Sequence, residues 1–211
     1  GEVGFVLVAG GQGSRLGFDG PKGAFPVGPL TDRTLFDWHA GRILAAGRRY
    51  GFRPAWAVMT SRTNDEATRA FFAANDHFGM PAEDVWFFSQ DMLPALDEKG
   101  RILLSGPGEL FLAPNGHGGT LRALSKSGVL GRFAERARAE GVRPAVYMVW
   151  PPAGTDLALA EASYADAAEG AGALLLPVGR AWRLALEADP DMPLYGLDGF
   201  HPSPTGTALA A

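Results

Sequence analysis

A short apolar run near the start of the chain, followed at once by glycines, limits the possible folds more than any other feature. Residues 4–9 read Gly-Phe-Val-Leu-Val-Ala, and Gly10 and Gly11 end the run. A continuous apolar run of this length, without alternation of polar residues, is typical of a strand buried on both faces of a parallel sheet. We therefore predict such a strand at 4–9, with a loop at its carboxyl end.

Strand-like and helix-like segments then alternate along the chain. Apolar residues recur with helical spacing over 35–44, a second buried strand is predicted at 55–59, and a third at 85–88. Between the last two, Thr63-Asn64-Asp65-Glu66 fits a capping box that would open a helix through Phe72. This order predicts an α/β fold with a Rossmann-like, mostly parallel sheet and flanking helices, in which ligands bind outside the carboxyl ends of the strands.

The second part of the chain differs in composition from the first, so we predict a first domain at 1–140 and a further α/β segment at 141–211. The elements expected after Gly119 are an interrupted helix to Ala139, a strand at 145–150, an Ala-rich helix to Glu169, a strand at 173–176, a helix at 181–188 and a terminal helix capped by Ser203-Pro204.

Composition excludes several classes of function. The 211 residues are 46% hydrophobic and 20% charged, which is typical of a globular protein with one sizeable core or two small ones. The net charge of −4 argues against binding to nucleic acid or to an anionic membrane, and no apolar run approaches the roughly 20 residues of a membrane span. Because the chain has no cysteine, it has no disulfide and no thiolate metal site, and we expect a cytoplasmic location.

The loop after the first strand has the composition of a phosphate-binding loop. Residues 10–17 read Gly-Gly-Gln-Gly-Ser-Arg-Leu-Gly, so backbone amides without side-chain bulk could close around phosphate oxygens, while Arg15 and Lys22 add positive charge. The spacing has one residue too many for the dinucleotide fingerprint, and Lys22 lies in Pro-Lys-Gly, unlike the P-loop lysine. A simple turn is the alternative.

Four ordered motifs carry a family resemblance over residues 1 to about 130. The segment Leu7–Gly17, followed by Pro21-Lys22-Gly23, resembles the signature of UTP-dependent UDP-sugar pyrophosphorylases, especially the UDP-N-acetylglucosamine pyrophosphorylase type. Three more segments agree in order and spacing: Met-Thr-Ser at 59–61, Phe-Phe-Ser-Gln with Met-Leu-Pro at 87–94, and Ala-Pro-Asn-Gly-His-Gly-Gly at 113–119.

The resemblance implies a role for each matching residue. Gly10 and Gly11 would lie against the base and ribose, and Gly13, Ser14 and Arg15 against the triphosphate. Lys22 would lie at the α-phosphate and the leaving pyrophosphate, and Gln90 and Gly116 at the uracil edge. His117 replaces the asparagine of the family and could hydrogen-bond a ribose or sugar hydroxyl; a solvent-exposed histidine at a loop tip is the alternative. The implied partners are UTP and a sugar 1-phosphate, or a UDP-sugar, with Mg²⁺ as cofactor.

The resemblance implies that residues 1–140 are part of a UTP-binding, nucleotidyltransferase-like domain. The tail at 141–211 departs from this family. Trp150 ends the predicted strand where the family has the aspartate that helps hold the metal, so the metal ligands are not identifiable. Segments 147–151, 177–182 and 194–206 instead resemble the C-terminal end of an SGNH (GDSL-type) hydrolase, in which Asp198 would orient His201 as general base to a serine. This second resemblance implies that the tail is part of an SGNH-hydrolase-like segment. No serine here has the context of that nucleophile. The alternatives to a uridylyltransferase are therefore an ester hydrolase remnant built on Asp198 and His201, or an inactive nucleotide-binding module.

Overall fold

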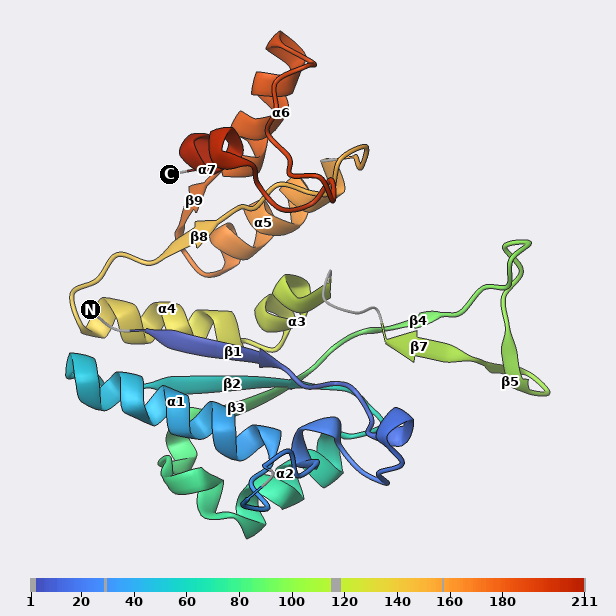
Figure 1. Cartoon of the computed structure of the whole chain (residues 1–211), viewed down its shortest axis with the longest axis vertical. Coiled ribbons are helices and arrows are strands. Elements are labelled where there is room, and N and C mark those ends of the chain that lie inside the picture. Colours follow the sequence, from blue (N-terminus) through green and yellow to red (C-terminus); the bar gives the residue numbers. More distant parts are fainter. Residues whose placement is uncertain (1–2, 29, 115–118, 157, 211) are drawn as a thin grey trace. The chain divides into compact units, whose positions relative to one another are not determined.

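The computed structural model describes residues 3–28, 30–114, 119–156 and 158–210, and the chain divides into two compact units, Gly1–Val129 and Leu130–Ala211. In the first unit, β1 (Gly4–Val8), β2 (Ala55–Thr60) and β3 (Val85–Ser89) form a parallel sheet in the order β1-β2-β3. The helices α1 (Leu35–Tyr50) and α2 (Asp65–Ala74) lie on one face of this sheet, and α3 (Thr120–Lys126) lies on the other (Figure 1). The predicted α/β fold is confirmed.

The strand β2 is the centre of the sheet, and β1 is not. All six residues of β2 are buried, and its neighbours pair with it on both sides. The prediction that β1 is buried on both faces is wrong: Val6 and Val8 are 44% and 38% exposed. The reason is topological, because β1 is a terminal strand of the sheet and only the face bearing Phe5 and Leu7 packs against the core.

The core of the first unit lies between the sheet and α1. The buried residues of α1 are Phe36, Ala40, Ile43 and Gly47, which recur every three or four residues and so share one face of the helix. Phe36 is fully buried, with its ring centroid 4.8 Å from that of Phe72 on α2. A capping box fixes the start of α1, since Asp37 N–H donates to the Thr34 hydroxyl and Thr34 N–H donates to the Asp37 carboxylate.

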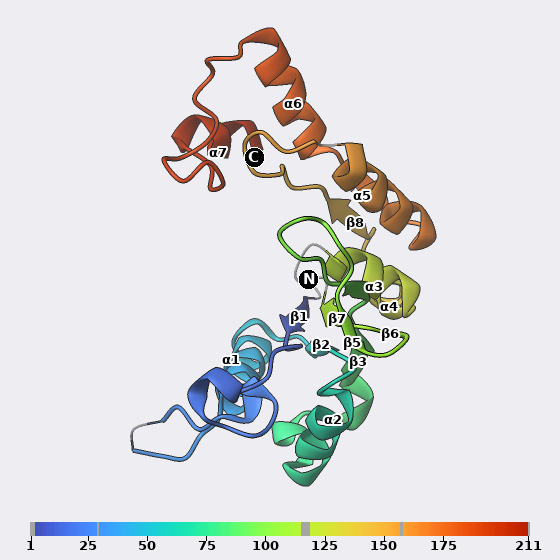
Figure 2. The same ribbon diagram turned by 90° about the vertical axis from the view of Figure 1, so that its right-hand side faces the viewer.

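Short elements complete the first unit. Four 3-10 helices are η1 (Ser14–Leu16), η2 (Lys22–Ala24), η3 (Asp76–Gly79) and η4 (Ala82–Asp84). Two antiparallel pairs, β4 (Met92–Pro94) with β7 (Leu112–Pro114) and β5 (Leu104–Gly106) with β6 (Glu109–Leu110), form an arm that projects from the sheet (Figures 1 and 2).

The second unit is a smaller α/β arrangement. Its elements are α4 (Val129–Ala139), β8 (Ala145–Tyr147), α5 (Ala158–Gly170), β9 (Leu174–Leu176), α6 (Val178–Ala188) and α7 (Pro204–Ala210), with β8 and β9 parallel. The strand predicted at 145–150 ends three residues early, because its partner β9 gives way to Pro177 and then to α6. The predicted Ser203 cap is confirmed, with Gly206 N–H donating to its hydroxyl at 3.0 Å. Among the described helices, none is both long and apolar enough to cross a membrane.

Candidate functional site

The glycine-rich loop leaves β1 and folds back on itself. Gly13 N–H donates to the carbonyl of Gly20 at 2.9 Å, and Lys22 N–H donates to the carbonyl of Gly11 at 3.0 Å. These two bonds close the loop at its middle and at its base. As a result Lys22, eleven positions after Gly11 in the sequence, lies directly beside it.

Gln90 reaches the same loop from β3. Its backbone N–H continues the sheet by donating to the carbonyl of Thr60 at 2.9 Å, and its side chain is buried. A Cβ placed on Gly10 would lie only 2.1 Å from Nε2 of Gln90. A residue larger than glycine at position 10 would therefore force the Gln90 amide out of its place, which explains in physical terms why the loop begins with glycine.

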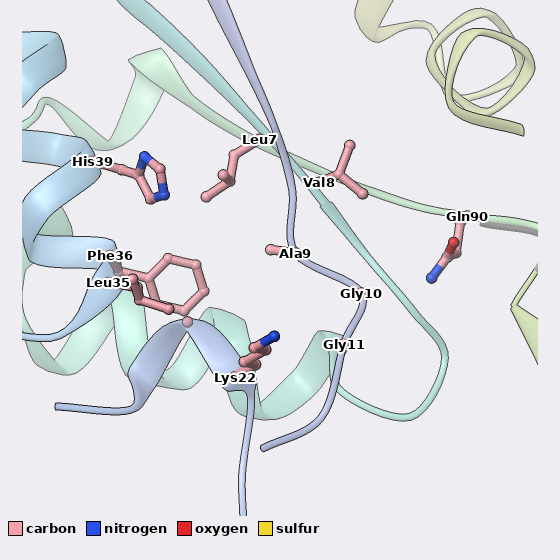
Figure 3. Close-up of a pocket in the computed structure, with 11 residues that line it drawn as sticks. Leu7, Val8, Ala9, Gly10, Gly11, Lys22, Leu35, Phe36, His39 and Gln90 are labelled. Carbon is pink, nitrogen blue, oxygen red and sulfur yellow. The ribbon is translucent and has the colours of Figure 1, made fainter. Parts of the chain in front are cut away.

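These residues surround a pocket of about 350 Å³ at the carboxyl end of β1. Its lining residues are Leu7, Val8, Ala9, Gly10, Gly11, Lys22, Gly23, Leu35, Phe36, His39 and Gln90. In Figure 3 the Lys22 and Gln90 side chains flank the Gly10–Gly11 segment from opposite sides. One end of the pocket thus offers a cation, an amide and backbone groups, and the other end, between β1 and α1, is apolar except for His39.

The structure brings together four of the residues predicted for nucleotide binding: Gly10, Gly11, Lys22 and Gln90. The other loop residues lie elsewhere. Gly13 is buried within the fold of the loop, whereas Ser14 and Arg15 lie on η1 with exposed side chains and are not among the lining residues of the pocket. Gly116 and His117 lie outside the described residues.

His39 lines the pocket and was missed as a site residue. It projects from α1 beside Phe36, and burial, followed by the positive charge of Arg42, lowers its pKa below the ordinary value. The lowered pKa favours the uncharged imidazole, which can both donate and accept a hydrogen bond. The signal in the sequence was a histidine next to Ala40 and three positions after Phe36, two of the apolar residues of the helical pattern of 35–44.

Asn64 is the second residue that was missed, and it corrects the predicted capping box. The helix α2 begins at Asp65 with Asn64 as its N-cap residue, and no side chain caps it. The Asn64 side chain, 1% exposed, instead donates to the carbonyls of Ala9 at 2.8 Å and Gly11 at 3.2 Å. Asn64 thus connects α2 to the glycine loop. Its side chain makes these two bonds, and the capping bonds that the local pattern predicted are not formed.

The described residues hold no group of three or more histidines or carboxylates that could bind a metal ion. Trp150, which stands where the resembled family has its metal-binding aspartate, donates its indole N–H to the carbonyl of Phe200 at 3.1 Å. The positive groups of the first unit that the sequence assigned to phosphate, Lys22 and Arg15, are both exposed to solvent.

In the second unit, His201 Nδ1 lies 2.5 Å from Oδ2 of Asp198, and the role of Asp198 in orienting a catalytic histidine stays a prediction. The hydrogen bond with His201, together with the backbone N–H groups of Phe200 and His201, lowers the pKa of Asp198 to about 2. Both side chains are exposed. The serine next along the chain, Ser203, has its hydroxyl bonded to the Pro193 carbonyl and to the N–H of Gly206, so it serves as the cap of α7.

Comparison with known proteins agrees with this reading of the first unit. A probable UDP-N-acetylglucosamine pyrophosphorylase of Schizosaccharomyces pombe is 41% identical over 145 residues, which is 64% of this chain and 30% of that protein. UDP-N-acetylglucosamine diphosphorylase 1 of Arabidopsis thaliana is 38% identical over 146 residues, or 64% of this chain and 29% of that protein. The chain therefore spans about 30% of the length of these relatives.

Solved structures give the same answer. The putative UDP-N-acetylglucosamine pyrophosphorylase of Entamoeba histolytica superimposes with a TM-score of 0.58 and 33% identity, covering 68% of this chain and 36% of that one. The Trypanosoma brucei enzyme, solved with an inhibitor, gives a TM-score of 0.53 and 40% identity over 59% of this chain and 26% of that one.

The family match has a clear extent. It covers residues 2–140 and ends before β8, so the resemblance of the tail to SGNH hydrolases stays a prediction. Since residues 2–140 are more than half of the 211 residues, the chain belongs to the family described as UTP--glucose-1-phosphate uridylyltransferase.

Proposed function

We propose that the first unit is the UTP-binding part of a UDP-sugar pyrophosphorylase, which transfers UMP from UTP to a sugar 1-phosphate and releases pyrophosphate. The observation that carries this proposal is the convergence of Gly10, Gly11, Lys22 and Gln90 on one pocket at the carboxyl ends of β1 and β3. The names of the relatives, with identities near 40%, favour an N-acetylated amino sugar as the substrate.

In the proposed reaction a phosphate oxygen of the sugar 1-phosphate attacks the α-phosphorus of UTP. The bond from that phosphorus to the bridging oxygen breaks, and pyrophosphate leaves with the electron pair. Phosphoryl transfer of this kind depends on positioning and on neutralising charge. We assign the neutralising role to Lys22, beside Gly11 at the base of the loop, and to Arg15, which a triphosphate extending along the loop could reach.

Recognition of the base is assigned to the buried side chain of Gln90. The Gln90 amide offers one donor and one acceptor, which suits the imide N–H and carbonyl of uracil. The edge of cytosine or adenine presents a different order of donors and acceptors, so a buried amide placed for uracil would be left unpaired. Gly116 and His117 keep their predicted roles at the uracil edge and at a ribose or sugar hydroxyl.

Mg²⁺ stays a prediction that the described residues do not yet accommodate. They contain no cluster of three candidate ligands, and Trp150 occupies the position of the expected aspartate. A metal that accompanies nucleotide phosphates needs only one or two protein carboxylates, but the structure identifies none for this role. We therefore derive no step of the reaction through a metal.

The test of base recognition is a titration of the purified chain with UTP, CTP and ATP. We expect UTP to bind most tightly and Gln90→Ala to remove the preference. Equal affinities for the three nucleotides in the wild-type chain would contradict the assignment of the base.

The test of turnover is a pyrophosphate-release assay with UTP, Mg²⁺ and several sugar 1-phosphates, with Lys22→Ala as the blank. We expect binding of UTP with little or no release, because Trp150 lacks the carboxylate expected there and the chain spans only about 30% of its relatives. Rapid release that depends on Lys22 would show that this chain contains a complete active site.

A second candidate function, ester hydrolysis, rests on the 2.5 Å contact between Asp198 and His201. This pair could orient and activate a general base, but the nearby Ser203 is engaged as a helix cap. We therefore expect no hydrolysis of aryl esters above that of a His201→Ala variant. Turnover that is lost with His201→Ala and with substitution of one particular serine would identify a hydrolase instead.

A further inference from the structure

We propose that Asn64 is a positioning residue for the nucleotide, which holds the glycine loop in the conformation that presents its amides to phosphate. This inference rests on the proposed function of the pocket, to which Asn64 adds a residue outside the lining set. It touches neither the expected substrate nor the reacting atoms, and so acts only through the loop.

The hydrogen bonds of Asn64 are complete. Its amide nitrogen donates both hydrogens, to the carbonyls of Ala9 and Gly11 at 2.8 and 3.2 Å, and its oxygen accepts from the backbone N–H and the hydroxyl of Ser61 at 2.8 and 3.0 Å. The side chain is 1% exposed, and its two bonds with Ser61 are buried, whereas its two bonds with the loop are partly buried. Asn64 therefore fixes the loop from the interior of the protein, where a hydrogen bond is strongest and an unpaired group is most costly.

The choice of carbonyls sets the direction of the neighbouring amides. In a trans peptide the N–H of one residue points opposite to the carbonyl of the residue before it, and the described residues contain no cis peptide. When Asn64 draws the carbonyls of Ala9 and Gly11 inward, the N–H groups of Gly10 and Gln12 face away from it. Gly10 lines the pocket, so its N–H, turned away from Asn64, is placed to donate to a phosphate oxygen bound there.

A simpler interpretation is that Asn64 serves only as the N-cap residue of α2. Its contacts distinguish this role from the positioning of the loop. A capping side chain accepts from an N–H of the first helical turn. Asn64 makes no such bond, and all four of its hydrogen-bonding capacities go to Ser61 and to the loop. The helix tolerates its arrangement without a side-chain cap, whereas the loop depends on the two donated bonds.

The two readings make opposite predictions for Asn64→Asp. Aspartate is as good an N-cap as asparagine, it suits the positive end of the helix, and its oxygens can still accept from Ser61. It cannot donate, however, and would set a carboxylate against the carbonyls of Ala9 and Gly11. A capping role predicts that Asn64→Asp behaves like the wild type, and a positioning role predicts that it behaves like Asn64→Ala or worse.

The experiment compares Asn64→Asp and Asn64→Ala with Asn75→Ala, a matched control on the same helix. Asn75 donates to the carbonyl of Phe71 at the other end of α2 and does not touch the loop. Two measurements are made on each variant: hydrogen exchange of the Gly13 and Lys22 amides, which close the loop, and the dissociation constant for UTP. Circular dichroism and the melting temperature verify that each variant is folded.

We expect exchange of the Gly13 and Lys22 amides to become at least about tenfold faster in both Asn64 variants and to stay unchanged in Asn75→Ala. Binding of UTP should weaken at least about tenfold in the same two variants, as expected for two lost hydrogen bonds. Wild-type exchange or wild-type affinity in Asn64→Asp would overturn the proposal. If the wild-type chain bound no UTP while the exchange rates changed as expected, the proposed function would fail and the role of Asn64 in ordering the loop would stand.

Discussion

Substitution of Gly10 by alanine should remove base discrimination while leaving the fold intact. The new Cβ would lie 2.1 Å from Nε2 of Gln90, whereas ordinary van der Waals contact begins at 3.4 Å, so the amide must retreat by at least about 1.3 Å. Hydrogen bonds tolerate a range of only about 0.5 Å in length, so a bonded base would lose both contacts with that amide. At about 0.5–1.5 kcal/mol each, the loss is about 1–3 kcal/mol, or about 5- to 140-fold in affinity for UTP.

Isothermal titration of Gly10→Ala, Gln90→Ala and the double variant with UTP, CTP and ATP measures this effect. We expect both single variants to bind the three nucleotides about equally, and the double variant to match Gln90→Ala, because the glycine acts only through the glutamine. Gly41→Ala is the control, since a Cβ there has no neighbour within 4 Å. A Gly10→Ala variant that kept the wild-type preference for UTP would refute the reasoning.

Two other predictions concern stability and protonation. Gly23→Ala places a Cβ 2.2 Å from the fully buried ring of Phe36, and we expect overpacking to lower the free energy of unfolding in urea by about 1–3 kcal/mol, with no loss in Gly41→Ala. Because the folded-state pKa of Asp198 is lowered to about 2, its contact with His201 contributes stability that is complete above about pH 4 and lost as the pH falls through about 2. An NMR titration of the Asp198 carboxyl carbon should show this midpoint, and His201→Ala should raise it; an unchanged midpoint would contradict the assigned cause.

The sequence predicted those parts of the site that local motifs encode. Gly10, Gly11 and Lys22 belong to one continuous loop, and Gln90 directly follows a strand that its apolar run predicted. Because the strands are parallel, the topology brings these residues to one edge of the sheet. The alternation of strands and helices over the first 90 residues was confirmed for the same reason, because each element carries its own periodicity.

What could not be predicted depends on contacts between distant segments. Asn64 bonds to a carbonyl 55 positions earlier in the chain, and nothing near position 64 marks that partner, so the local pattern suggested a capping box instead. The exposure of Val6 is likewise set by the place of β1 in the sheet, not by its apolar sequence. His39 was visible only as one polar residue on an apolar helix face, a pattern that packing alone can explain.

Because β1 is a terminal strand of the described sheet, its outer edge has no partner strand there. Among the described residues, the bonds that hold the glycine loop run to β2, to Thr63 and Asn64 ahead of α2 and within the loop itself, and the bonds of β1 run to β2. The opposite edge of β1 therefore has no part in shaping the loop. A strand that paired with this edge would leave the bonds of the loop unchanged. If the proposed function is correct, the residues that hold the nucleotide are structurally independent of whatever pairs with the outer edge of β1.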